Sequence, residues 1–267
     1  MNRTERKMVE ILEKGKEAHG VVSVKAEFEA EGTRPDELLR LVDVARSAGL
    51  PLTLKIGGCE AIRDLLEAKQ IGVKYIVAPM IETPYALSKY IHARNLVYSE
   101  DERDGMHFLF NMETLTAYGH RQEMIEMARD SLSGIVFGRV DFSGSMGLGR
   151  SEIETDAVTD KVVEVANLCK ENGLELVMGG AISIDALPNL RRVEATGGLS
   201  RFETRKVVFS AKSVEAENIE DGLLNAVHFE LLWLMNKRDY YNTIKEEDHN
   251  RIEMLESRWQ VLGKSVL

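Results

Sequence analysis

The sequence predicts an α/β protein. The expected fold is a (β/α)8 barrel of parallel strands, regular or irregular, with a C-terminal helical arm. Three observations support this fold class. Short apolar runs alternate with amphipathic segments along nearly the whole chain, as in repeated βα units with right-handed crossovers. Two of the apolar runs end in carboxylates, as barrel strands do at a site. The length of 267 residues, 44% of them hydrophobic, fits one large domain.

Seven strands are expected from the apolar runs, at residues 21–28, 52–56, 75–80, 107–112, 134–140, 174–178 and 202–210. A closed barrel of this class needs eight strands. Either the stretch before Gly20 contains the missing strand, or the run 199–213 contains two, or the barrel is irregular. The pattern leaves these three alternatives open.

Helices are expected between the strands, at residues 35–48, 59–68, 84–93, 116–129, 153–172 and 184–195. Gly49, Gly72 and Gly173 stand where helix C-caps are expected. We assign residues 1–217 to the barrel and 218–267 to a C-terminal helical extension. In this extension an apolar stretch, 218–235, precedes a charged arm, 236–259. The extension either closes its own barrel or packs on a neighbouring subunit.

The composition excludes several classes of partner. The net charge is -10 and there is no basic tract, which argues against nucleic acid and acidic membranes as partners. The charged N-terminus and the lack of a long apolar stretch predict a soluble, cytoplasmic protein. Cys59 and Cys169 stand far apart in no ligand spacing, so neither a disulfide framework nor a zinc site is indicated.

Polar residues recur at every second position of the predicted strands, so they share one strand face. If the apolar side chains face the helices, the polar side chains point toward the barrel axis. They are Lys25, Glu27 and Glu29; Lys55; Asn111 and Glu113; Arg139 and Asp141; Glu203 and Arg205. Burying so many charges costs several kcal/mol each unless they are paired or bind an ion. Pairing within Lys25/Glu27 and Glu203/Arg205 is as plausible as a functional role.

Glu113 and Asp141 are the strongest candidates for a functional site. Each stands at the end of an apolar strand-like run, where a buried parallel strand has no structural need for an acid. Two carboxylates and water molecules form the hard-oxygen environment that Mg²⁺ or Mn²⁺ prefers. The pair therefore predicts a divalent metal site.

Four segments resemble the HpcH/HpaI aldolase and citrate lyase family, which includes metal-dependent aldolases that act on 2-oxo acids. They read Leu-Lys-Ile-Gly at 54–57, Ile-Val-Ala-Pro-Met-Ile-Glu-Thr at 76–83, Met-Glu-Thr at 112–114, and Val-Phe-Gly-Arg-Val-Asp-Phe-Ser-Gly-Ser-Met-Gly at 136–147. The last segment is the most specific. Glu82 also stands in an Ile-Glu-Thr motif, but the order of the elements favours Glu113 as the metal ligand and Glu82 as a helix N-terminal acid.

The resemblance implies roles for individual residues. Glu113 and Asp141 bind the metal, and backbone N–H groups near Val140 and Asp141 hold a substrate carboxylate. Lys55 stands where the family has an arginine, which is a different group for carboxylate recognition. The family's histidine loop is not recognisable, and Glu29 or Glu31 is its candidate replacement.

The chemistry expected is that of a carbon–carbon lyase or aldolase for a small anionic oxo acid. Lys55 or Arg139 adds positive charge at the developing enolate oxygen, Lys25 helps bind the substrate, and Glu29 is a candidate base. A Schiff base on Lys25 or Lys55 is the less economical mechanism. The alternatives are a citrate-lyase-like enzyme for an acyl-CoA thioester and a non-catalytic barrel that binds a small acid. A homo-oligomer is expected.

Overall fold

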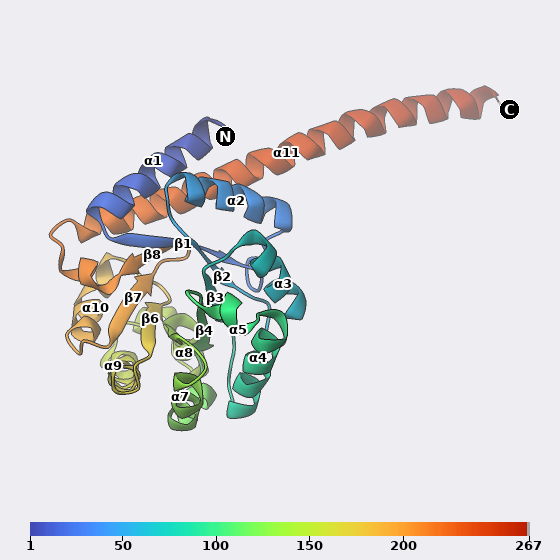
Figure 1. The fold of residues 1–267 in the computed structure, drawn as a ribbon. Helices are drawn as coiled ribbons and strands as arrows, with labels where there is room; N and C mark the ends of the chain where they lie inside the picture. The colour runs from blue at the N-terminus through green and yellow to red at the C-terminus, as the bar shows by residue number, and fades with distance from the viewer. Residues whose placement is uncertain (266–267) are drawn as a thin grey trace.

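The strands of the computed structural model close into a barrel in the order in which they occur along the chain (Figure 1). The structure describes residues 1–265. The strands are β1 (Val21–Glu27), β2 (Leu52–Lys55), β3 (Tyr75–Ala78), β4 (His107–Met112), β5 (Gly134–Gly138), β6 (Glu175–Gly179), β7 (Leu199–Glu203) and β8 (Val207–Ser210). The predicted barrel is therefore confirmed, with eight strands.

The eighth strand runs in the opposite direction to its neighbours. Strands β1 to β7 pair in parallel, whereas β8 pairs antiparallel with both β7 and β1. The single strand expected at 202–210 is thus wrong: the run holds two strands joined by the turn 204–206, in which the Thr204 N–H donates to the Val207 carbonyl at 2.9 Å. Three residues cannot form a crossover to a parallel strand, so the turn imposes the antiparallel direction.

Helices cover the outside of the barrel in the usual alternation (Figure 1). The stretch before Gly20 forms a helix, α1, and contains no strand. The missing strand is instead the second of two strands in the run 199–213, which was the second alternative. The helices are α1 (Arg3–Ala18), α2 (Pro35–Ser47), α3 (Ile62–Ile71), α4 (Pro84–Val97), α5 (Glu100–Arg103), α6 (Leu115–Gly119), α7 (Arg121–Arg129), α8 (Arg139–Ser145), α9 (Asp156–Glu171), α10 (Leu187–Glu194) and α11 (Ile219–Ser265), with the 3₁₀ turns η1 (Arg150–Glu152), η2 (Ile184–Ala186) and η3 (Ala211–Glu215).

Side chains fill the barrel axis in layers. Val77, Leu109, Val136 and Val177 form an apolar layer halfway along the strands. Nearer the strand starts, Glu175 accepts from His107 at 2.9 Å and from Arg201 at 2.5 Å, and this polar group closes the N-terminal end of the barrel. The charged residues near the strand ends lie on the other side of the apolar layer. The candidate site therefore lies at the C-terminal mouth, where the βα loops gather.

The last helix, α11, is 47 residues long and packs on α1 with its first half. Its second half leaves the barrel and extends away from it (Figure 1). Within residues 1–265, none of the helices combines the length and the apolar character that crossing a membrane requires.

Candidate functional site

A network of buried charges occupies the C-terminal mouth of the barrel. The Lys25 Nζ contacts the carboxylate of Glu203 and lies 3.1 Å from Glu27 Oε1. The Lys55 Nζ lies 3.6 Å from Glu27 Oε1 and 2.9 Å from Glu29 Oε2. Lys25, Glu27, Lys55 and Glu203 are all buried, as the period-two alternation of their strands predicts.

The charges in this network hold both lysines in their cationic form. Burial disfavours the ammonium group of Lys25, but the carboxylates of Glu203 and Glu27 outweigh burial and raise its pKa. Burial and the charge of Lys25 act against the ammonium group of Lys55, yet Glu27 and Glu29 give its pKa a net rise. A protonated lysine is not a nucleophile, so the network weighs against a Schiff base mechanism.

Of the two pairings that the sequence left open, Lys25 with Glu27 is formed, and Glu203 with Arg205 is not. Glu203 ends β7 and contacts Lys25, whereas Arg205 lies in the β7–β8 turn and donates from Nε to Glu31 Oε1 at 3.0 Å. The turn rotates the chain between the two residues, so they no longer share a strand face. Glu31 also contacts Lys206, and it therefore ties the β1–α2 loop to the hairpin.

Glu113 follows β4 and its carboxylate accepts two hydrogen bonds. The Met80 N–H donates to Oε1 at 2.9 Å, and the Asn111 Nδ2 donates to Oε2 at 2.7 Å. Met80 has a φ of 50°, in the left-handed region that non-glycine residues rarely adopt. The backbone of the β3–α4 loop is therefore strained at the residue whose N–H donates to the Glu113 carboxylate. Burial raises the pKa of Glu113, and the nearby Asp141 adds to this effect.

Asp141 lies in the first turn of α8, not at the end of a strand. Strand β5 ends at Gly138 and α8 begins at Arg139, so the predicted strand 134–140 is two residues too long. Gly138, at the end of β5, lies directly beside Glu113: a Cβ atom at this residue would lie 2.6 Å from Glu113 Oε2 and 2.9 Å from Glu113 Cβ. The absence of a side chain at Gly138 makes room for the Glu113 carboxylate.

A second glycine opens the space at the start of α8. A Cβ atom on Gly180 would lie 2.8 Å from the Arg139 N and 2.7 Å from the Val140 N, and Gly180 has a φ of 85°. First-turn N–H groups have no acceptor within their own helix. Gly180 therefore lets the loop after β6 approach the first turn of α8 closely, and the role of the N–H groups near Val140 and Asp141 stays a prediction. The sequence analysis missed Gly180, although the Gly179–Gly180 pair after a strand is a visible signal.

Arg139 does not face the barrel axis with Asp141. It is fully buried, and its guanidinium donates to Glu154 Oε2 at 2.8 Å and to the Gly180 carbonyl at 2.8 Å. The expected strand alternation fails because both residues belong to α8, where two positions apart means roughly opposite faces. The partners of Arg139 are protein groups, so its placement gives no support for a role at the substrate oxygen. It instead holds the loop after β6 against α8.

The residues present fit a divalent metal ion of the hard-oxygen type. Asn111 Oδ1 is buried next to Glu113 and has no hydrogen-bond partner in the described residues. The same residues contain no group of three or more His, Cys, Asp or Glu side chains arranged to hold a metal. Glu113 and Asp141 would thus be the charged ligands, in a site that leaves other positions to water or substrate oxygens, as Mg²⁺ sites commonly do.

The other predicted acids lie in loops of the same mouth. Glu29 is in the β1–α2 loop and contacts Lys55, so it stands beside the charge network. Glu82 is in the β3–α4 loop, immediately before Thr83, whose hydroxyl caps α4 by accepting from the Ala86 N–H at 3.2 Å. Its position is that of an acid near a helix N-terminus.

Comparison of the structure with solved structures identifies the fold. No protein-family model matches the sequence, and no curated protein matches it. An HpcH/HpaI aldolase from Desulfitobacterium hafniense superposes with a TM-score of 0.58 at 14% identity, over 74% of this chain and 81% of that chain. An HpcH/HpaI aldolase/citrate lyase family protein from Burkholderia cenocepacia gives 0.56 at 14% identity, over 73% and 81%.

A third similar structure is a malate synthase from Haloferax volcanii in a magnesium/glyoxylate complex. Its TM-score is 0.54 at 14% identity, over 74% of this chain and 65% of that chain. At these identities the similarity establishes the architecture and not the reaction. The chain has the fold of the HpcH/HpaI aldolase and citrate lyase family proteins, as its four sequence segments indicate.

Proposed function

We propose that this protein is a divalent-metal-dependent carbon–carbon lyase or aldolase that acts on a 2-oxo acid or a related oxo acid. The observation that carries the proposal is the buried carboxylate of Glu113, whose pKa is raised by burial and by the charge of Asp141, beside an Asn111 Oδ1 that has no hydrogen-bond partner among the described residues. Mg²⁺ and Mn²⁺ are the cations that such an oxygen set suits. The similar structures support an enzyme of this kind, since they include aldolases and a malate synthase with magnesium and glyoxylate.

A metal ion held by Glu113 and Asp141 would supply Lewis-acid stabilisation of the negative charge that develops on the substrate's keto oxygen. The chain's own groups provide the rest. The first-turn N–H groups near Val140 and Asp141 would bind the substrate carboxylate. Lys55, whose pKa is raised by its neighbouring carboxylates, would add positive charge at the mouth.

An acid beside Lys55 would accept the proton that the substrate hydroxyl loses. Glu29 is in contact with Lys55 and part of its side chain reaches solvent, so it can take a proton from a substrate hydroxyl and pass it on. Lys25 lies deeper, bound by Glu27 and Glu203, and its proposed contribution is to keep Glu27 charged and in place below Lys55. Glu29 is thus the residue whose loss should affect turnover more than metal affinity.

Calorimetric titration with Mn²⁺ and Mg²⁺ tests the proposal. The full chain should bind one metal ion, and pyruvate or oxaloacetate should tighten the binding because the oxo acid adds two oxygen ligands. Glu113→Gln and Asp141→Asn should each abolish the binding. Glu82→Gln is the matched control, since Glu82 lies in the loop after the neighbouring strand β3, and it should leave the binding unchanged.

The outcomes separate the alternatives. Metal binding with release of pyruvate from 4-hydroxy-2-oxo acids supports the aldolase. Metal binding with cleavage of an acyl-CoA thioester and not of free acids would favour the citrate-lyase-like reaction. If the wild-type protein binds no metal ion even with an oxo acid present, the proposal fails, and a non-catalytic barrel becomes the better description.

A further inference from the structure

We propose that α11 is a self-association helix that pairs antiparallel with α11 of a second copy of this chain, with Lys245 of each copy opposite Asp248 of the other. The proposal concerns a surface remote from the barrel mouth and goes beyond the proposed function. It rests on the position of the helix, on the spacing of its exposed apolar residues and on the charges between them.

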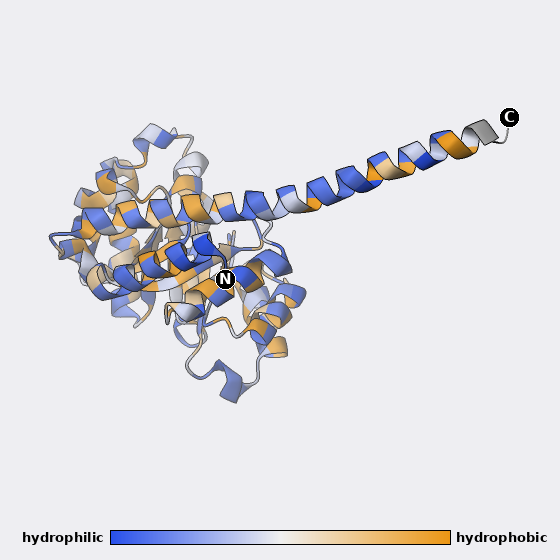
Figure 2. Cartoon of the chain, turned by 90° about the horizontal axis from the view of Figure 1, so that it is seen from above, coloured by the Kyte–Doolittle hydropathy of each residue, from blue (hydrophilic) through white to orange (hydrophobic). Residues whose placement is uncertain are grey.

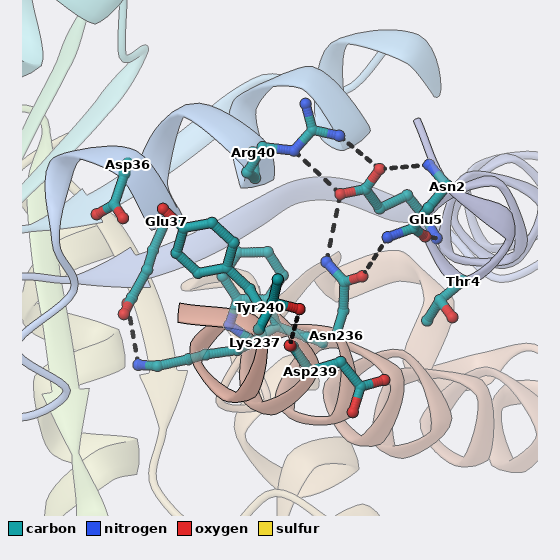
Figure 3. A pocket seen from close by; sticks show the side chains of 12 residues that line it. Asn2, Thr4, Glu5, Asp36, Glu37, Arg40, Asn236, Lys237, Asp239 and Tyr240 are labelled. Carbon is teal, nitrogen blue, oxygen red and sulfur yellow. Dashed lines mark hydrogen bonds and ion pairs between the residues drawn. The ribbon is translucent and has the colours of Figure 1, made fainter. Parts of the chain in front are cut away.

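The first half of α11 is firmly held by the barrel. Phe229 and Trp233 are buried against it. Where the helix leaves the barrel, Asn236 and Lys237 join a polar cluster with α1 and α2 around a cavity of about 360 Å³ (Figure 3). The Asn2 Nδ2 donates to Asn236 Oδ1 at 2.6 Å, and the Lys237 Nζ lies 2.9 Å from Glu37 Oε2. This cluster fixes the direction in which the helix continues.

The second half of α11 has no support from its own barrel. From residue 242 to residue 263 every residue is exposed. Apolar residues nevertheless continue along the helix to its far end (Figure 2). Most helical stability in proteins comes from packing of an apolar face, and this stretch has no such packing within the described residues. The exposed half therefore needs a partner surface.

Eight exposed apolar residues of the two halves share one heptad phase. In the first half, four residues spaced by three, four and three positions face away from the barrel and are more than half exposed: Leu224, Val227, Leu231 and Leu234. Four heptads later the same spacing recurs, again with residues more than half exposed: Ile252, Leu255, Trp259 and Leu262. Such a repeat of seven is the pattern of a coiled-coil seam.

The positions between these two groups determine the orientation. In the same phase they are occupied by Arg238, Tyr241, Lys245 and Asp248. A parallel pair would place Lys245 against Lys245 and Asp248 against Asp248, and like charges in a seam repel. An antiparallel pair can place Lys245 opposite Asp248 twice, so the charges complement each other only with a second copy in this orientation.

The same antiparallel register also matches the apolar residues. With Lys245 opposite Asp248, Leu231 falls opposite Leu262, and Leu234 opposite Trp259, in both halves of the pair. Each copy thus covers Leu231 and Leu234 of its partner with its own far end. The paired stretch spans about 47 Å, and left-handed supercoiling compensates the drift of about 20° per heptad between the seam and a straight helix.

Two neighbouring residues provide a matched test of the seam. Leu262 and Val261 are 63% and 66% exposed, but only Leu262 lies in the seam. We expect the full-length protein to be an elongated dimer by sedimentation velocity and light scattering. Leu262→Asp and Leu231→Asp should both dissociate it, and Val261→Asp should not. A wild-type protein that is monomeric at micromolar concentration overturns the proposal.

Charge reversal tests the register. Lys245→Asp or Asp248→Lys alone should raise the dissociation constant roughly tenfold or more, because each places like charges opposite each other in two layers. The double variant should return to near wild-type affinity. Single reversals without effect would indicate a parallel pair and overturn the register. If Leu262→Asp dissociates the dimer but Leu231→Asp does not, the far end docks elsewhere on the second copy, which also overturns it.

Discussion

Replacing Gly138 by alanine tests the geometry of the candidate metal site with one methyl group. The backbone of Gly138, with φ of -87° and ψ of 92°, is open to any residue, so alanine brings no backbone strain. Its Cβ atom, however, would lie 2.6 Å from Glu113 Oε2 and 2.9 Å from Glu113 Cβ. Since atoms in contact prefer about 3.5–4.0 Å, the Glu113 side chain must shift by about 1 Å.

Such a shift breaks at least one of the two hydrogen bonds that hold the carboxylate, from the Met80 N–H at 2.9 Å or from the Asn111 Nδ2 at 2.7 Å. A hydrogen bond to a charged group contributes about 1.5–3 kcal/mol. The replacement of glycine by alanine restores about 0.4–1 kcal/mol through the unfolded chain. We expect a net loss of about 1–2 kcal/mol in the free energy of unfolding. Metal affinity should fall about 10–100-fold, as it does when groups that orient ligands are changed.

Mn²⁺ titration calorimetry and urea unfolding measure these two effects. Gly144→Ala is the control, because a Cβ atom there meets nothing within 4 Å and the residue lies in the same helix as Asp141. It should bind Mn²⁺ as the wild type does. If Gly138→Ala also keeps wild-type affinity for Mn²⁺, the Glu113 carboxylate does not hold the metal from this position, and the reasoning is refuted.

Three further predictions follow from the buried groups. Lys25→Met should lower the free energy of unfolding by about 3–5 kcal/mol, measured by urea denaturation, because Glu27 and Glu203 lose their buried counter-charge; a loss below 1 kcal/mol would contradict it. Because burial raises the pKa of Glu113, protons should compete with Mn²⁺ from a higher pH than for an ordinary carboxyl group, so affinity should fall as the pH drops from 7 to 5; equal affinities at both values would argue against this ligand. Burial raises the pKa of the Cys169 thiol to about 12, so a thiol reagent should modify it only on unfolding, and rapid labelling of the folded protein would be inconsistent with its burial.

The sequence predicts the strands and their inward faces well, because local periodicity determines both. Lys25, Glu27 and Lys55 face the barrel interior because side chains alternate along a strand and the opposite faces are apolar. The strand His107–Met112 and its acid Glu113 follow from the same rule. Alternation fails only where the period changes without a local signal, as at Gly138, where a strand gives way to a helix.

Long-range packing decides what periodicity leaves open. The reversed strand β8 follows from the three-residue turn 204–206, in a run that the sequence left open as one strand or two. The partners of Arg139, which are Glu154 and the carbonyls of a distant loop, come from segments that no local pattern links to it. The space beside Glu113 likewise depends on a glycine from the next strand.

The sequence by itself determined the barrel class, the polar mouth and the pair of acids proposed as metal ligands, because each depends on which residue types recur at which spacing. Only the tertiary structure decided that Arg139 contacts other protein groups, that the Asn111 Oδ1 has no hydrogen-bond partner among the described residues, and that α11 leaves the barrel with an exposed seam. The physical reason is that spacing fixes the face of an element, whereas contacts between elements depend on register and direction, which the whole chain sets together.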